Sequence, residues 1–285
     1  MRWMFLNGEI VRGSAAQVSA LDRGLLHGYG LFETMRSYGG RVFRLGEHYS
    51  RLCEGAARLA MDVPLSLSQL GEAVQALLRR NDLPDACLRL TVTAGPQPDA
   101  AGNAAEAAVF LSARPLTDYP QDLYRRGMAA VVSPVRRNET SPLSRIKSLN
   151  YLDNLLARED AHRHGADEAI LLNTRGFVVE GSASNVFLVH QGRLLTPGVE
   201  AGALPGITRQ VVLELASALG FEPTESEVEP SALEDASEAF LTNSVMEVMP
   251  LTSLNGRPLG PGRPGPLTDR LRPLYRELAE AEPKT

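Results

Sequence analysis

The 285-residue sequence is poor in cysteine and has no long apolar run. Its two cysteines, Cys53 and Cys87, cannot build a disulfide framework, so we expect a cytoplasmic protein. No apolar stretch approaches the roughly 18 residues of a membrane span, and the start of the chain turns polar too soon for a signal peptide. These absences argue against membrane-embedded and disulfide-rich secreted proteins.

The sequence also lacks a large excess of charge of either sign. The 29 basic residues nearly balance 34 acidic ones, giving a net charge of −5, and the arginines are scattered along the chain. This balance argues against nucleic acid as the main partner. A hydrophobic content of 44% is too high for a disordered chain. The length suggests about two domains, and the remaining class is a globular protein, most often an enzyme.

Lysine is the scarcest charged residue, because every basic residue except Lys147 and Lys284 is arginine. If the segment around Lys147 needed only a solvated positive charge, an arginine would suit it equally well. A guanidinium stays protonated and cannot act as an amine nucleophile, whereas a desolvated lysine amine can. Lys147 is therefore either an ordinary surface charge or a chemically active amine.

The hydrophobic pattern predicts two domains of mixed strands and helices. A small N-terminal α/β domain spans residues 1–115, a Pro- and Tyr-containing linker spans 116–125, and a larger domain with Lys147 spans 126–285. Residues 88–93 alternate apolar and polar side chains, which predicts a strand with one polar face. Residues 45–60 have the spacing of an amphipathic helix, and Ser66 with Gln69 predicts a capping box.

The second domain has hairpin signals and several helices. Asn255-Gly256 predicts a tight turn, and Pro205-Gly206-Ile207-Thr208 begins a helix that runs to Leu219. We expect a helix near 152–163 with Leu152, Leu155 and Leu156 on its buried side. Hairpins with segregated helices indicate an α/β (α+β-like) fold in two lobes.

Several known motifs are missing. Gly28-Tyr29-Gly30 lacks the third glycine of a dinucleotide fingerprint, and no lysine stands where a P-loop needs one. His162 and His164 lie two apart on a predicted helix and point different ways, so we expect no metal site. Ser144-Arg145-Ile146-Lys147 matches S-x-x-K, but the K-T-G element of serine hydrolases that use this motif is absent.

The remaining polar residues fit a cofactor that carries a phosphate. Gly206-Ile207-Thr208 opens a helix whose N-terminus favours an anion, although ordinary N-capping explains it too. Asn243 and Ser244 end a strand, as a simple turn also would. Arg51 lies on an amphipathic helix and could bind an anion, or it could be an ordinary surface arginine. Glu180 lies at a strand end and could pair with a cofactor, or it could be an exposed edge carboxylate. A pyridoxal 5′-phosphate (PLP) enzyme needs an amine, phosphate donors, a carboxylate for the pyridine nitrogen and a hydrogen-bonding group for the ring oxygen.

The chain resembles class IV (fold-type IV) PLP aminotransferases and lyases essentially end to end. The resemblance is carried by Asp22–Gly24, Gly28–Thr34, Glu47–Leu52, Lys147–Glu159, Glu180–Phe187, Leu204–Arg209 and Thr242–Val248.

The resemblance implies a role for each matching position. Lys147 would be the Schiff-base lysine, Glu180 would pair with the pyridine nitrogen, and Tyr151 would face the ring oxygen. Arg51, Ile207, Thr208 and Ser244 would hold the phosphate beside Asn243. It also implies two lobes with the cofactor between them, a homodimer, a small amine or amino-acid-like substrate, and neither nucleic acid nor membrane as a partner.

The subfamily follows from less specific residues. Thr242–Pro250 looks most like the 4-amino-4-deoxychorismate lyases, so we expect a lyase that forms p-aminobenzoate and pyruvate for folate biosynthesis. The alternative is an aminotransferase of branched-chain or D-amino acids with a 2-oxo acid acceptor. Arg89 is also an arginine in branched-chain enzymes, and the candidate substrate-binding residues are Arg89, Val245 and Met246. A catalytically silent binding protein on the same fold is a further alternative.

Overall fold

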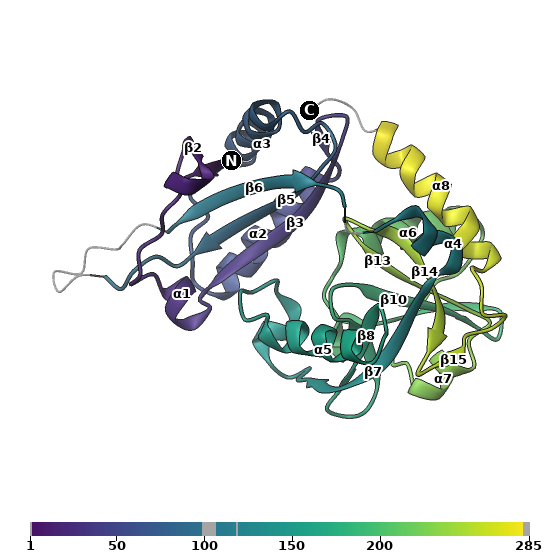
Figure 1. Ribbon diagram of the computed structural model, residues 1–285. Coiled ribbons are helices and arrows are strands. Elements are labelled where there is room, and N and C mark those ends of the chain that lie inside the picture. Colours follow the sequence, from purple (N-terminus) through teal and green to yellow (C-terminus); the bar gives the residue numbers. More distant parts are fainter. Residues whose placement is uncertain (1, 99–106, 118, 282–285) are drawn as a thin grey trace. The chain divides into compact units, whose positions relative to one another are not determined.

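The computed structural model of the chain describes residues 2–98, 107–117 and 119–281, and these residues form two compact units (Figure 1). The first unit comprises Met1–Leu116 with Ile146–Asn150, and the second comprises Thr117–Arg145 with Tyr151–Ala281. Lys284 lies outside the described residues. Within the described ranges, no helix combines the length and hydrophobicity that a membrane span requires.

The first unit is built on a six-stranded sheet whose strand order is β2-β1-β6-β5-β3-β4 (Figure 1). Every pairing in it is antiparallel. Asn7-Gly8 and Gly39-Gly40 have the positive φ angles that tight hairpin turns need. The strands are β1 (Trp3–Leu6), β2 (Glu9–Arg12), β3 (Gly30–Tyr38), β4 (Arg41–Val42), β5 (Ala86–Thr93) and β6 (Val109–Pro115).

The helices of the first unit are α1 (Arg23–His27), α2 (Leu45–Arg58) and α3 (Leu67–Asn81), with a 3-10 turn at Gly13–Ala15. Of these, α2 and α3 pack on the sheet. The capping box at Ser66 and Gln69 is confirmed. Leu31 of β3 and Leu52 of α2 are both about 2% exposed or less, so the interface between this helix and the sheet is dry.

The alternation of apolar and polar residues in 88–93 predicted a strand with one polar face, and the pairing of β3 with β5 agrees with it. Phe32 pairs with Thr91 and Thr34 pairs with Arg89, so these four side chains share one face. Glu33 pairs with Leu90 on the opposite face. That opposite face is the one that packs on α2, because a Cβ at Gly55 of α2 would meet the side chain of Leu31.

The second unit contains a nine-stranded mixed sheet. Its order is β12-β11-β10-β13-β14-β7-β8-β9, with β15 paired to β14. The pairs β14–β7, β7–β8 and β11–β12 are parallel. The strands are β7 (Met128–Arg137), β8 (Glu168–Asn173), β9 (Val178–Gly181), β10 (Asn185–His190), β11 (Arg193–Pro197), β12 (Thr224–Ser226), β13 (Glu238–Asn243), β14 (Glu247–Leu254) and β15 (Arg257–Pro258).

Helices complete the second unit. They are α4 (Gln121–Arg126), α5 (Leu152–Arg163), α6 (Ile207–Ala218), α7 (Pro230–Glu234) and α8 (Pro266–Ala281), with 3-10 turns at Pro142–Arg145 and Val199–Ala201. The predicted α/β class with mixed sheets and helices is confirmed. Residues 116–125 were expected to be a linker, but α4 buries Leu123 and Tyr124 in the hydrophobic core of the second unit.

One prediction about packing is wrong. Leu152, Leu155 and Leu156 of α5 are 65%, 49% and 52% exposed, although we expected them on the buried side. The small side chains Ala157 and Ala161 face the sheet instead, in a cluster with residues of β8. Alanines allow α5 to approach the sheet closely, which leaves the leucines on the outer side.

Candidate active site

Lys147 is fixed by backbone pairing to the edge of β3. The N–H of Phe32 donates to the carbonyl oxygen of Lys147 at 2.9 Å, and the N–H of Leu149 donates to that of Gly30 at 2.9 Å. Gly30 is required at this point, because a Cβ there would lie 2.6 Å from the carbonyl oxygen of Val92. Lys147 was predicted to lie in the second domain, whereas its segment, Ile146–Asn150, packs as part of the first unit.

The Phe32 ring contacts two cationic side chains. The Lys147 Nζ lies 4.5 Å from the ring centroid, and the guanidinium carbon of Arg89 lies 3.8 Å from it. Phe32 itself is 2% exposed. Cations favour the face of an aromatic ring because of its quadrupole. The ring therefore brings together the predicted Schiff-base lysine and the predicted substrate-binding arginine.

Arg51 of α2 is paired with the buried carboxylate of Glu33, which was not among the predicted site residues. Its Nε and Nη2 donate to the two oxygens of Glu33 at 2.9 and 2.6 Å. The Nδ1 of His48 lies 2.7 Å from Glu33 Oε2. Burial by itself raises the pKa of Glu33, but the Arg51 charge and the His48 contact outweigh it and hold that pKa at about 2. Burial lowers the pKa of His48 below its ordinary value.

Glu180 lies at the end of β9 in the second unit, and its carboxylate has fixed partners. Its Oε1 accepts a hydrogen bond from Arg137 Nη2 at 2.7 Å. Its Oε2 accepts from the backbone N–H of Leu204 at 2.9 Å and from Asn185 Nδ2 at 3.4 Å. An ion pair with an arginine favours the charged carboxylate. Glu180 is therefore a buried anion of fixed orientation.

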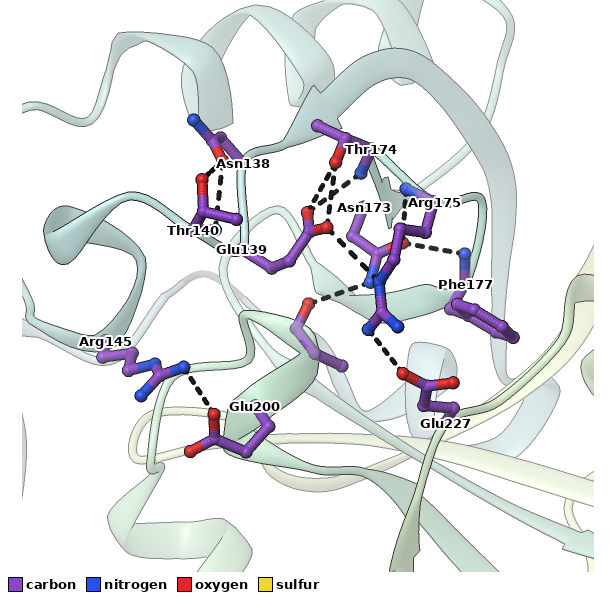
Figure 2. Close-up of polar contacts among 11 residues, drawn as sticks. Asn138, Glu139, Thr140, Arg145, Asn173, Thr174, Arg175, Phe177, Glu200 and Glu227 are labelled. Carbon is purple, nitrogen blue, oxygen red and sulfur yellow. Dashed lines mark hydrogen bonds and ion pairs between the residues drawn. The ribbon is translucent and has the colours of Figure 1, made fainter.

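A polar network holds the end of β7, where Arg137 lies. Figure 2 shows Glu139 accepting hydrogen bonds from the N–H and hydroxyl of Thr174, while Arg175 bridges Glu139 and Glu227. Hydrogen bonds from its own backbone and from Thr174 hold the pKa of Glu139 below its usual range. Gly202 has a φ of +102°, and a Cβ there would lie 3.1 Å from Arg137 Cγ. The network thus fixes the backbone that presents Arg137 to Glu180.

The same figure shows how neighbouring loops are tied together. Asn173 accepts from the backbone N–H groups of Arg175 and Phe177 at 3.1 and 2.9 Å. Its Nδ2 donates to the carbonyl oxygen of Ala201 at 3.2 Å. Arg145 pairs with Glu200 at 2.6 Å (Figure 2). Residues 138–145, which lead along the chain to Lys147, combine these side-chain contacts with a 3-10 turn at Pro142–Arg145 and backbone hydrogen bonds from Ser141 and Ser144.

The turn after Glu180 depends on a second buried carboxylate. Glu168 accepts hydrogen bonds from the N–H of Ser182 at 3.1 Å and from the hydroxyl of Ser184 at 2.9 Å, and its Oε1 also contacts the hydroxyl of Ser182. Gly181 permits this, because a Cβ there would collide with the hydroxyl of Ser184. Glu168 therefore determines the shape of residues 181–184.

Tyr151 is anchored to this turn. Its hydroxyl donates to the carbonyl oxygen of Ser182 at 2.8 Å, and Asn154 Nδ2 donates to the same oxygen at 2.7 Å. Burial and the nearby charges of Glu180 and Glu168 raise the pKa of Tyr151 above its ordinary value. The phenol therefore stays protonated, with its proton committed to Ser182 and its oxygen able to accept a further hydrogen bond.

The predicted phosphate residues of the second unit lie at two backbone turns. Gly206 precedes α6, and among the described residues no side-chain hydrogen bond caps this N-terminus. A Cβ at Gly206 would collide with Asn185 Oδ1. The Thr208 hydroxyl lies 3.3 Å from that of Tyr275, so its side chain faces the core while its backbone opens the helix.

Asn243 shapes the second turn, which contains Ser244. Its Oδ1 accepts from the N–H groups of Val245 and Met246 at 2.9 and 2.8 Å, and its Nδ2 donates to the carbonyl oxygen of Ala183 at 3.0 Å. Met246 is 1% exposed and belongs to the hydrophobic core of the second unit. The Asn-Ser-Val-Met sequence thus serves the turn and the core.

The structure brings the predicted residues together in groups. Lys147 and Arg89 meet at Phe32, and Tyr151 and Asn243 meet at the turn that follows Glu180. Sequence reasoning missed Phe32, Glu33, His48, Arg137 and Glu168. One signal was available for Glu33, which interrupts the apolar face of Leu31 and Met35, because a carboxylate at such a position needs a buried partner.

A family model described as "Amino-transferase class IV" matches residues 30–254. The branched-chain-amino-acid aminotransferase of Pseudomonas aeruginosa is 33% identical over 98% of this chain and 93% of that protein. The crystal structure of the Escherichia coli branched-chain aminotransferase superposes with a TM-score of 0.91 at 33% identity, covering 99% of this chain and 97% of that one. The PLP form of the branched-chain aminotransferase from Thermobaculum terrenum has a TM-score of 0.86 at 30% identity, covering 98% and 94%.

These similarities correct the predicted activity. The prediction of a 4-amino-4-deoxychorismate lyase in folate biosynthesis is wrong, because the relatives that match nearly the whole chain are branched-chain aminotransferases. Within Thr242–Pro250, the segment behind that prediction, Asn243 shapes a turn and Met246 lies in the core. The expected cofactor is confirmed at the level of the family, whose members use PLP. The chain belongs to the class IV aminotransferases, a family of fold-type IV enzymes.

Proposed function

We propose that this chain is a PLP-dependent branched-chain aminotransferase, which moves the amino group of a branched-chain amino acid to a 2-oxo acid. The observation that carries the proposal is the match over nearly the whole chain to branched-chain aminotransferases of known structure. The geometry of the predicted lysine supports it, because the backbone of β3 holds Lys147 with its amine on the Phe32 ring beside Arg89.

The residues present fit the cofactor. Glu180 is a buried, ion-paired carboxylate suited to a protonated pyridine nitrogen, and the α6 N-terminus at Gly206 is suited to a phosphate. Arg51 offers a guanidinium held in one orientation. When bound, PLP supplies an electron sink that acidifies the proton on the substrate's α-carbon and carries the amino group between half-reactions.

The chain's own residues would then bind, orient and move protons. Lys147 Nζ would hold the cofactor covalently and, once released, carry the proton of the substrate's α-carbon. Glu180 would keep the pyridine nitrogen protonated, and the Tyr151 hydroxyl oxygen would accept a hydrogen bond at the ring oxygen. The phosphate would be bound by Arg51, by the α6 N-terminus at Ile207 and Thr208, and by Ser244 in the turn that Asn243 shapes.

Arg89 and Phe32 would select the substrate. The Arg89 guanidinium offers a charged donor for a carboxylate, and the Phe32 ring beneath it would fix its position. Val245 is 8% exposed and would present only the edge of its side chain to a branched group. Met246 is sealed in the core, so the proposal gives it no contact with substrate. Arg89 is exposed, which leaves its guanidinium accessible to an incoming acid.

The proposal includes a homodimer in the cytoplasm. Large hydrophobic side chains are exposed on or just before α1 in the first unit and on α5 in the second, and grouped exposed leucines are typical of protein interfaces. They are Val18, Leu21, Leu25, Leu26, Leu152, Leu155 and Leu156. The sequence has only two cysteines, Cys53 and Cys87, which suits a reducing compartment.

The activity can be tested by supplying leucine, isoleucine or valine of either hand with 2-oxoglutarate to the purified, PLP-loaded protein. We expect glutamate and the branched 2-oxo acid to form in equal amounts from one enantiomer, and none with Lys147→Ala. Turnover of an amine without any 2-oxo acid acceptor, or no turnover with any branched-chain amino acid, would contradict the proposal.

A further inference from the structure

A carboxylate is buried in the dry interface between the sheet and α2. Glu33 is 1% exposed, on the same face of β3 as Leu31 and Met35, which are 1% and 0% exposed. Burying an ion pair carries a desolvation cost that its attraction rarely recovers, so such a pair is weak evidence for a stabilising role. The position of Glu33 therefore calls for a role beyond holding the fold.

The geometry shows what Glu33 orients. Both of its oxygens bind one edge of the Arg51 guanidinium, at 2.9 Å to Nε and 2.6 Å to Nη2. A bidentate pair of this kind fixes the plane of the guanidinium as well as its position. Arg51 is 11% exposed whereas Glu33 is 1% exposed, so the arginine is the outer partner and the carboxylate its inner support.

His48 fixes the carboxylate in turn. It lies on α2 one turn before Arg51, is 2% exposed, and contacts Glu33 Oε2 at 2.7 Å through Nδ1. Burial and the charges of Arg51 and Lys147 lower the pKa of His48 despite the opposing effect of Glu33. A neutral imidazole that donates its Nδ1 proton to Glu33 satisfies both groups.

The adjacent residue connects this cluster with the reactive lysine. The N–H of Phe32 binds the carbonyl oxygen of Lys147, and the Phe32 ring contacts the Lys147 amine. Because successive side chains of a strand point to opposite faces, Phe32 and Glu33 support two different groups from one dipeptide. β3 thus supports both the Lys147 amine and the Arg51 guanidinium.

We propose that Glu33, itself held by His48, is the positioning residue that orients the Arg51 guanidinium to receive the phosphate of the cofactor. The inference rests on the proposed function, in which Arg51 binds that phosphate. Glu33 does not touch the ligand and acts through Arg51. Two alternative roles predict different results in the binding experiment. In one, Glu33 serves only the packing of α2; in the other, its charge weakens the attraction of Arg51 for an anion.

The experiment compares the apoprotein's affinity for PLP with its affinity for pyridoxal, which lacks the phosphate. We expect Glu33→Gln to weaken PLP binding about tenfold to a hundredfold, the effect of losing charge-assisted hydrogen bonds, and to leave pyridoxal binding unchanged. Arg51→Gln should behave alike, and the double variant should be no weaker than Arg51→Gln. Glu47→Gln is the matched control, because it breaks the exposed Arg44–Glu47 pair of 2.7 Å at the start of the same helix.

A second pair of variants covers the case in which Glu33→Gln does not fold. His48→Asn keeps a donor near the Nδ1 position and should retain PLP affinity, whereas His48→Leu removes the donor and should weaken binding of PLP but not of pyridoxal. Folding is checked by circular dichroism.

Three results would overturn the inference. PLP affinity equal to or above wild type in Glu33→Gln would show that the carboxylate does not assist Arg51. Equal losses for PLP and pyridoxal would show a purely structural role, as would equal effects of His48→Asn and His48→Leu. A wild-type protein that binds no PLP would refute the proposed function as well, so the two failures are distinguishable.

Discussion

The Lys147 amine lies 4.5 Å from the centre of the Phe32 ring, on a residue whose backbone N–H also binds the Lys147 carbonyl oxygen at 2.9 Å. One residue of β3 thus fixes the lysine at its backbone and at its amine. The contact between ring and amine is worth roughly 0.5–2 kcal/mol, depending on desolvation.

Phe32→Leu should therefore lower kcat/KM by about threefold to thirtyfold, because the amine loses its cation–π contact while the backbone pairing remains. Steady-state kinetics with a branched-chain amino acid measures the effect. Phe110→Leu is a suitable control, since Phe110 lies on β6, two strands away from β3, opposite Thr91 of β5. Equal losses in the two variants would show that the ring has no special relation to Lys147.

Acid should destabilise the protein through Glu33. The folded state lowers the pKa of Glu33 from 4.5 to about 2. This pH-dependent contribution to stability is complete above pH 4.5 and is lost as the pH falls toward 2. Urea unfolding of wild type and Glu33→Gln across this range measures it, and the difference between the two proteins should shrink as the pH falls. A difference independent of pH would contradict the assignment.

Glu168 should stabilise the second unit through the turn at residues 181–184. Glu168→Gln removes the charge that accepts from Ser182 and Ser184, and we expect a loss of about 1.5–3 kcal/mol in the free energy of unfolding. Glu159→Gln breaks only the exposed pair with Arg163 and should cost under about 0.5 kcal/mol. If the two variants unfold at the same urea concentration, Glu168 does not support the turn.

Gly206 should be required for the shape of the α6 N-terminus. A methyl group there collides with Asn185 Oδ1, although the φ of −70° suits any residue. Gly206→Ala should cost about 1–3 kcal/mol of stability and weaken PLP binding. Gly198→Ala, where no atom lies within 4 Å of the added methyl, should leave both quantities unchanged. Tight PLP binding by Gly206→Ala would exclude this turn from the phosphate site.

Local patterns predicted much of the fold. The alternation in residues 88–93 gave the two faces of β5, and the capping box at Ser66 and Gln69 formed as expected. Both depend on contacts between residues close in sequence. The same holds for the hairpin turn at Asn255, which has the expected positive φ.

Contacts between residues far apart in the sequence were harder to predict. Nothing local to residues 146–150 shows that they pair with β3, over a hundred residues earlier in the chain. The leucines of α5 were expected to be buried because the periodic pattern cannot say which of two faces meets the sheet, and Ala157 and Ala161 took that place. Glu33 and Glu168 were missed because their partners lie on other elements.

The most direct test of the whole account is to find the residue that carries the cofactor. The PLP-loaded protein is reduced with borohydride, digested and analysed by mass spectrometry, with Lys147→Ala treated in parallel. We predict that the pyridoxyl group is found on the peptide containing Lys147 and that the variant retains none after reduction. Label on the α-amino group or on Lys284, or labelling that survives in Lys147→Ala, would contradict the account.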